Sequence, residues 1–125
     1  MIQQLTLVVI GGACGAVLRF LVVTAMAAFL GRAFPWGTLT VNVVGSFVIG
    51  VLFVVLTERA PSGAEAWRAL LVVGFLGALT TFSAFSIETV TLLQSGQAAR
   101  ALANVLANVC LCFGSCWLGL LLARA

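Results

Sequence analysis

The sequence predicts an all-α integral membrane protein that crosses the bilayer four times. Apolar residues make up 63% of its 125 residues and charged residues only 7%, whereas a soluble domain carries about 25% charged residues. The charges also leave uncharged stretches at 33–57, 69–87 and 101–123, each near the roughly 20 residues that a helix needs to cross the hydrocarbon. The first 31 residues contain one charge, Arg19, and form the remaining stretch.

Turn signals divide the chain, which we expect to be a single domain over 1–125, into these spans. The expected spans are about 4–30, 36–57, 67–95 and 98–123. Pro35 separates the first two, and Pro61 lies with Ser62 and Gly63 in a loop of typical turn composition before the third. A secretory signal peptide is not expected, because residues 1–10 hold no basic region and Arg19 interrupts the apolar run.

The charges outside the spans hardly favour one orientation in the membrane. One side would carry Arg59, Arg68 and Arg124, and the other side Arg32 and Arg100. Such a small difference is almost no positive-inside bias. Charge counting therefore leaves two possibilities open: insertion in both orientations, which allows an antiparallel dual-topology homodimer, or one orientation set by Arg19 or the α-amino group. The arginines are scattered, so a nucleic-acid partner is not expected.

The third span is expected to be broken near mid-membrane. It contains Gly74 and Gly77, which weaken a helix, followed by a run of hydroxyl residues at 80–86 that offers the backbone competing hydrogen bonds. At about 29 residues it also exceeds one straight crossing. A break would free carbonyl groups that can bind a cation. The alternative is an unbroken packing helix whose hydroxyls bond back to their own carbonyls.

The other spans carry stripes of small and polar residues. The stripes are Gly11, Gly15 and Arg19; Thr38, Asn42, Gly45, Ser46 and Gly50; and Asn104, Asn108, Cys112, Ser115, Cys116 and Gly119. Helical spacing puts each stripe on one face. Tight helix packing explains part of this pattern. Polar groups inside a membrane are costly, however, and they often mark an ion pathway.

The side chains of this pathway favour an anion. Hydrogen-bond donors are available from Asn42, Asn104, Asn108, Thr81 and Ser83. Phe82 and Phe85 can offer the positive edges of their rings, and Arg19 adds positive charge. A cation path would more typically show rings of acidic residues. Glu88 is the one acid within a span, and we expect it to pair with an arginine near the interface.

Other classes of protein fit less well. The chain has no His and no Asp, and it offers no nucleophile and base within reach, so an enzyme is not expected. The four cysteines lie in apolar spans and are expected to act as small hydrophobic residues. A small multidrug transporter would need a buried carboxylate early in the chain, where this sequence has Arg19. An assembly factor would explain the glycines but not the clustered Phe, Thr and Asn.

Three blocks of sequence resemble the Fluc/CrcB fluoride-channel family in order and spacing. They are Gly-Gly-Ala-Cys-Gly-Ala-Val-Leu-Arg at 11–19, Pro-Trp-Gly-Thr-Leu-Thr-Val-Asn at 35–42 with Gly-Ser-Phe at 45–47, and Gly-Phe-Leu-Gly at 74–77 with Thr-Thr-Phe-Ser-Ala-Phe-Ser at 80–86. Each block alone would be weak evidence for the family, but the three together are highly specific. The resemblance covers nearly the whole chain.

The resemblance implies an antiparallel homodimer in the bacterial inner (plasma) membrane, with two fluoride pores along the subunit interface. It implies passive fluoride export from the cytoplasm, and a structural Na⁺ at the dimer centre bound by the carbonyls of Gly77 and Thr80. The other residues carried over to the pore are Asn42, the pair Phe82 and Phe85, and Arg19. The implied partners are fluoride, the second subunit and membrane lipid.

Two positions depart from the family pattern. Ala84 stands where the family usually has Thr, so one hydroxyl of the polar track is missing. In the fourth span Cys112 falls where members often carry a pore-lining serine, with Asn108 one turn earlier. A thiol donates hydrogen bonds more weakly than a hydroxyl, so we expect slower conduction unless Asn108 compensates.

Overall fold

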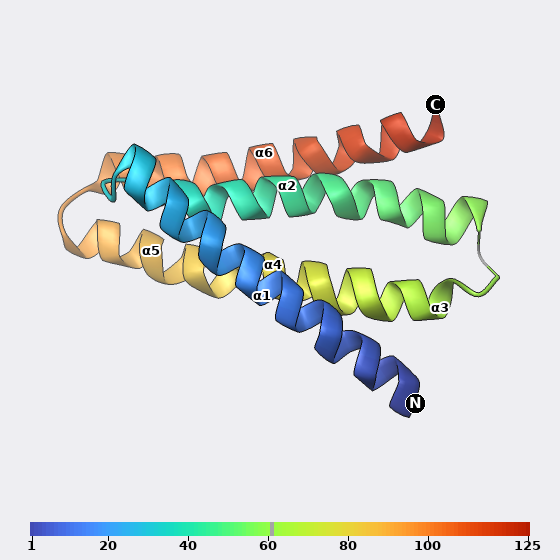
Figure 1. Ribbon diagram of the computed structural model, residues 1–125. Coiled ribbons are helices and arrows are strands. Elements are labelled where there is room, and N and C mark those ends of the chain that lie inside the picture. Colours follow the sequence, from blue (N-terminus) through green and yellow to red (C-terminus); the bar gives the residue numbers. More distant parts are fainter. Residues whose placement is uncertain (61) are drawn as a thin grey trace.

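The computed structural model describes residues 1–60 and 62–125 and is all-helical, with four helices long and apolar enough to span a membrane (Figure 1). These spans are Ile2–Leu30, Trp36–Arg59, Ala64–Gln94 and Ala98–Arg124. The predicted all-α class and the four membrane-spanning helices are confirmed. The third span begins at Ala64, three residues before the predicted start, because Gly63 at φ 76° already turns the chain into the helix. The predicted turn residue Pro61 lies outside the described residues.

Each span is built from one or more helical elements. The first is α1 (Ile2–Leu30), and the second is α2 (Trp36–Phe53) continued by the π-helical η1 (Val54–Arg59). The third joins α3 (Ala64–Trp67), the π-helical η2 (Arg68–Leu76), α4 (Gly77–Leu79) and α5 (Phe82–Gln94). The fourth is α6 (Ala98–Arg124).

Two residues with extended backbone separate α4 from α5. Thr80 has ψ 155° and Thr81 has φ −155° and ψ 114°. The side chain of Thr81 then caps α5, because its Oγ1 accepts the N–H of Ala84 at 3.1 Å. The hydroxyl residues after Gly77 thus stop one helix and start the next, as competition between side chain and backbone allows.

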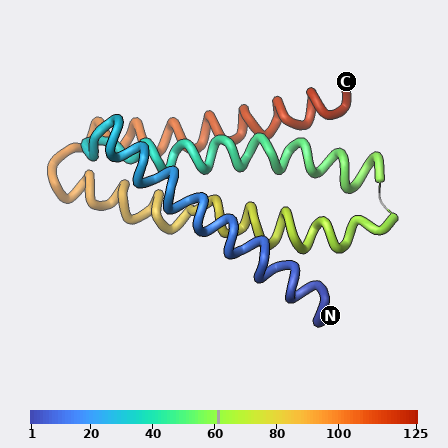
Figure 2. Tube along the Cα trace, in the orientation of Figure 1, coloured from blue at the N-terminus to red at the C-terminus, as the bar shows by residue number. Residues whose placement is uncertain are grey.

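The helices pack as two close pairs, α2 with α6 and α1 with the third span, and glycines bring the helices of each pair together. In Figures 1 and 2, α2 and α6 run side by side, while α1 crosses the third span, mainly at η2. A Cβ added at Gly15 would lie 2.1 Å from the carbonyl oxygen of Phe75, and one added at Gly119 would lie 2.3 Å from that of Phe47. Glycine at these positions lets the backbones approach, as is common in membrane helix pairs.

Both chain ends lie at the same end of the bundle (Figure 1). Arg124 forms an ion pair with Glu58 at 2.6 Å, and the Gln4 amide donates to Glu65 at 3.4 Å. The contacts therefore gather the two termini and the second connection at one end, and the first and third connections at the other. This arrangement places the arginines on the two ends in the three-against-two distribution counted from the sequence.

The buried interior is small and partly polar. Val41, Leu76 and Leu79 form its apolar cluster, whereas most large apolar side chains are exposed, as suits helices that face lipid. Two buried side chains are amides, Asn104 and Asn108. Because a polar group inside a membrane needs a partner, these amides lead to the candidate site.

Candidate functional site

A cavity of about 390 Å³ lies between α2, α6 and the interruption of the third span. It is lined by Asn42, Gly45, Ser46, Ile49, Leu76, Thr80, Thr81, Phe82, Phe85, Asn108, Val109, Cys112 and Phe113. No charged residue is among them. Nine of the residues singled out from the sequence meet here: Asn42, Gly45, Ser46, Thr80, Thr81, Phe82, Phe85, Asn108 and Cys112.

The amide of Asn42 holds the interruption in place from the neighbouring helix. The N–H of Thr81 donates to Asn42 Oδ1 at 2.8 Å, and Asn42 Nδ2 donates to the carbonyl oxygen of Thr81 at 3.2 Å. The side-chain amide thus pairs with a backbone unit that has lost its helical partners. Non-helical backbone at membrane depth requires such protein contacts, since lipid offers none.

Two asparagines of α6 continue this contact. Asn42 Nδ2 donates to Asn108 Oδ1 at 3.0 Å. Asn108 Nδ2 in turn donates to the carbonyl oxygen and to Oδ1 of Asn104, both at 3.0 Å. Asn104 is fully buried, and its Nδ2 donates to Thr89 Oγ1 at 3.0 Å. We call Asn42, Asn108 and Asn104 the amide relay.

The predicted phenylalanine pair lies at the cavity. The ring centroids of Phe82 and Phe85 are 5.2 Å apart, and the planes meet at 61°, so one ring presents its edge to the other. Phe85 is buried at 8% exposure, whereas Phe82 is 78% exposed. Both phenylalanines thus line the same cavity as the amides of Asn42 and Asn108, and the exposed Phe82 forms part of its open rim.

The hydroxyl groups of the third span behave in two ways. Thr80 donates back to the carbonyl of Leu76 at 2.9 Å, and Ser86, Thr89 and Thr91 likewise bond to the carbonyl four residues earlier. Such back-bonding is what the packing-helix interpretation expects. Thr81 and Ser83 differ, because their hydroxyls lie 3.2 Å from each other. Ser83 is exposed and does not line the cavity.

The carbonyl groups of Gly77 and Thr80 lose their usual helical donors. In an unbroken helix they would accept the N–H groups of Thr81 and Ala84. Those two N–H groups donate instead to Asn42 Oδ1 and Thr81 Oγ1. Two main-chain oxygens next to the interruption are therefore left for another donor or for a cation, which fits the chemistry expected for a sodium site.

Arg19 lies away from the 390 Å³ cavity. It lines a separate depression of about 300 Å³ with Thr38, Thr81 and Glu88, among others. Thr81 borders both hollows. The sequence placed Arg19 with the other candidate residues, but α1 brings it to the opposite side of the interruption from Asn108.

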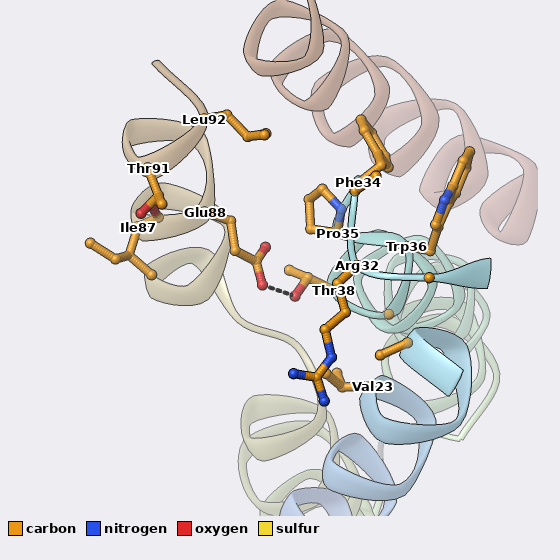
Figure 3. A pocket seen from close by; sticks show the side chains of 14 residues that line it. Val23, Arg32, Phe34, Pro35, Trp36, Thr38, Ile87, Glu88, Thr91 and Leu92 are labelled. Atoms are coloured by element: carbon orange, nitrogen blue, oxygen red, sulfur yellow. Dashed lines mark hydrogen bonds between the residues drawn. The ribbon is translucent and has the colours of Figure 1, made fainter. Parts of the chain in front are cut away.

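Glu88 corrects one expectation. It lines a third hollow of about 310 Å³ near the first connection (Figure 3), where its carboxylate faces Thr38 and Thr38 Oγ1 donates to it at 2.6 Å. The expected pairing with an arginine is wrong: across 1–60 and 62–125 the structure contains one ion pair, between Arg124 and Glu58. The second oxygen of Glu88 is buried and, among the described residues, has no hydrogen-bond partner.

Several lining residues were not predicted from the sequence. They are Ile49, Leu76, Val109 and Phe113. The available signal was helical spacing, since 109 and 113 lie four residues apart on one helix face, next to the face of 108 and 112. Their apolar character made them indistinguishable from lipid-facing positions.

Cysteine and metal-ligand chemistry has little support within the described part of the chain. All four cysteines are free, and no group of three or more His, Cys, Asp or Glu side chains gathers there. The hollow that contains Cys112 instead combines amides, hydroxyls and aromatic edges.

Four apolar spans, three of which line an uncharged cavity that contains amides and hydroxyls, are typical of a multi-pass membrane protein of the ion-pathway type. A family model described as CrcB-like protein, Camphor Resistance (CrcB), matches residues 6–120. The chain is 51% identical over 122 residues to a protein of Magnetococcus marinus named fluoride-specific ion channel FluC, with 98% of each chain covered. Proteins of the same name from Geobacter metallireducens and Coxiella burnetii are 48% identical over 125 residues and 45% identical over 122 residues, covering 97% and 98% of this chain and 98% of each relative.

The chain therefore belongs to the CrcB family, as the resemblance of its three sequence blocks indicated. Its relatives are named as ion channels, so this is a non-enzymatic family, and the expectation that the chain is not an enzyme is confirmed.

Proposed function

We propose that this chain forms a fluoride-selective channel that lets fluoride leave the cytoplasm passively across the bacterial inner membrane. The observation that carries the proposal is the uncharged cavity that the amides of Asn42 and Asn108 line together with the rings of Phe82 and Phe85. The relatives named as fluoride-specific channels support the identity of the ion.

The chemistry of the cavity suits a small anion. Amide and hydroxyl groups donate hydrogen bonds, and aromatic edges carry partial positive charge. A carboxylate would repel an anion, and the nearest acid, Glu88, lines other hollows instead. Coupled transport would need a titratable relay in the membrane, and one acid does not supply it.

We further propose that two antiparallel copies enclose two pores along their interface. In one chain the cavity is open, because Phe82 and Phe113 at its rim are 78% and 74% exposed. A second copy is the partner that the family resemblance implies, and the near balance of arginines between the two ends permits insertion in both orientations. The interruption of the third span would then lie near mid-membrane, at the dimer centre.

A structural sodium ion at that centre completes the proposal. The residues that would bind it are Gly77 and Thr80, through their freed main-chain oxygens. Oxygen ligands of this kind suit a hard cation, and unwound carbonyls coordinate sodium in other membrane proteins. When bound, the ion would neutralise the carbonyl dipoles of the interrupted segment.

The test is ion flux through purified protein in liposomes. Wild-type protein should pass fluoride down its gradient and largely exclude chloride, and Phe82→Ile and Asn42→Asp should both reduce the fluoride flux. Equal fluoride and chloride flux, or no fluoride flux with the wild-type chain, would refute the proposal.

Labelling tests the topology separately. A C-terminal tag should be reached from both sides of the membrane in similar amounts if both orientations insert. One-sided labelling would contradict the antiparallel dimer while leaving fluoride conduction open to the flux assay.

A further inference from the structure

The amide relay fixes the direction of every amide in it. At one end the N–H of Thr81 can only donate, so the atom of Asn42 that it contacts must be the oxygen. At the other end the carbonyl of Asn104 can only accept, so the atom of Asn108 that it contacts must be the nitrogen. Both ends require the same arrangement, with Asn42 Nδ2 facing Asn108 Oδ1 at 3.0 Å.

In this arrangement no proton of the two cavity-lining amides is free. An amide nitrogen has two protons to donate. Those of Asn42 go to the carbonyl of Thr81 and to Asn108, and those of Asn108 go to the two oxygens of Asn104. An anion in the cavity must therefore replace Asn108 as the acceptor before Asn42 can donate to it.

We infer that Asn108 is a specificity-determining residue of the proposed channel, held in position by Asn104. It acts as a competing acceptor: only an anion that accepts hydrogen bonds strongly replaces it at Asn42. Fluoride, the smallest halide with the highest charge density, does so more readily than chloride. Selectivity for fluoride then comes partly from the free energy that chloride would need to displace Asn108 from Asn42. This inference rests on the proposed fluoride conduction.

The test measures the fluoride-to-chloride flux ratio in liposomes for Asn108→Leu, which removes the competing acceptor at similar size. We expect the ratio to fall by about tenfold, the effect of one neutral hydrogen bond. The matched control is Ser115→Ala, which removes another bond from α6 to α2, donated to the carbonyl of Val43 at 3.0 Å. It should leave the ratio unchanged.

A double mutant separates positioning from direct contact with the ion. In an Asn42→Ala background, Asn108→Leu should change the fluoride-to-chloride flux ratio less than about twofold, because the amide that Asn108 competes for is already gone. Equal effects in both backgrounds, or no effect in either, would overturn the inference. Should the leucine variant fail to fold, Asn108→Ser serves, because its hydroxyl is too short to reach Asn42.

A measurement without ion flux keeps this inference distinct from the proposed function. In ¹⁵N-labelled protein, the side-chain protons of Asn42 should exchange with solvent about tenfold faster in Asn108→Ser than in the wild-type chain or in Ser115→Ala. Unchanged exchange would refute the relay even if fluoride flows. Faster exchange in a chain that conducts no fluoride would establish the relay and refute the proposed channel.

Discussion

Replacing Gly119 by alanine should separate α2 from α6. A Cβ at this position would lie 2.3 Å from the carbonyl oxygen of Phe47, whereas ordinary contact begins at 3.4 Å. The obstacle is backbone, which cannot rotate away as a side chain can. The two helices must therefore move apart by about 1 Å at the crossing, and overpacking of this kind costs about 1–3 kcal/mol.

Gly114→Ala is the matched control for this prediction. Gly114 lies on the same helix, and nothing stands within 4 Å of its added Cβ. Both substitutions bring the same gain in helix propensity, about 1 kcal/mol, so the difference between them isolates the packing cost. Unfolding in mixed micelles, followed by tryptophan fluorescence, measures that difference. Equal stability of the two variants within about 0.5 kcal/mol would refute the close approach of the helices.

Three further predictions concern the proposed pore. Cys112→Ser should raise fluoride flux, because a hydroxyl donates hydrogen bonds better than a thiol. Cys110→Ser should leave the flux unchanged, because Cys110 is exposed and does not line the cavity. Equal changes of flux in both variants would contradict this reasoning. Phe82→Ile should lower fluoride flux by removing a ring edge, whereas Phe29→Ile, at an 85% exposed position in α1, should leave it unchanged. Exchanging sodium for N-methylglucamine should lower the thermal midpoint of the purified protein at constant ionic strength, and an unchanged midpoint would argue against the sodium site.

Composition and helical spacing predicted much of this fold and part of its site. Uncharged stretches marked the four spans, because a charge inside the bilayer is too costly to scatter freely. The spacing of Asn104 and Asn108 put them on one face of α6, as residues four apart must lie on a helix. Spacing does not give the register between two helices, however. It could not show that Asn108 meets Asn42, or that α1 takes Arg19 to a different hollow.

Glu88 illustrates the same limit. Its charge made an arginine the expected partner, but the partner is Thr38, on a helix that lies far away in the sequence. A hydroxyl at the start of a neighbouring helix carries no signal that distinguishes it from other hydroxyls. Arg32 and Arg19 each line a hollow together with Glu88, but among the described residues neither forms an ion pair with it, so packing rather than charge decides which group meets the carboxylate.

The interruption at Thr80 and Thr81 divides hydrogen-bonding groups along the chain, leaving acceptors before it and donors after it. Breaking a helix frees N–H groups after the break and carbonyl groups before it in equal number. Here the N–H of Thr81 is satisfied by Asn42 and that of Ala84 by Thr81, while only the carbonyl of Thr81 gains a new donor, from Asn42. The carbonyls before the break are left with excess acceptor capacity, and the cavity beside it is lined by the amides of Asn42 and Asn108, whose protons an anion gains by replacing their present acceptors. An anion in the cavity and a cation at the carbonyls are complementary to this division, so one interruption can account for both ions of the proposed function.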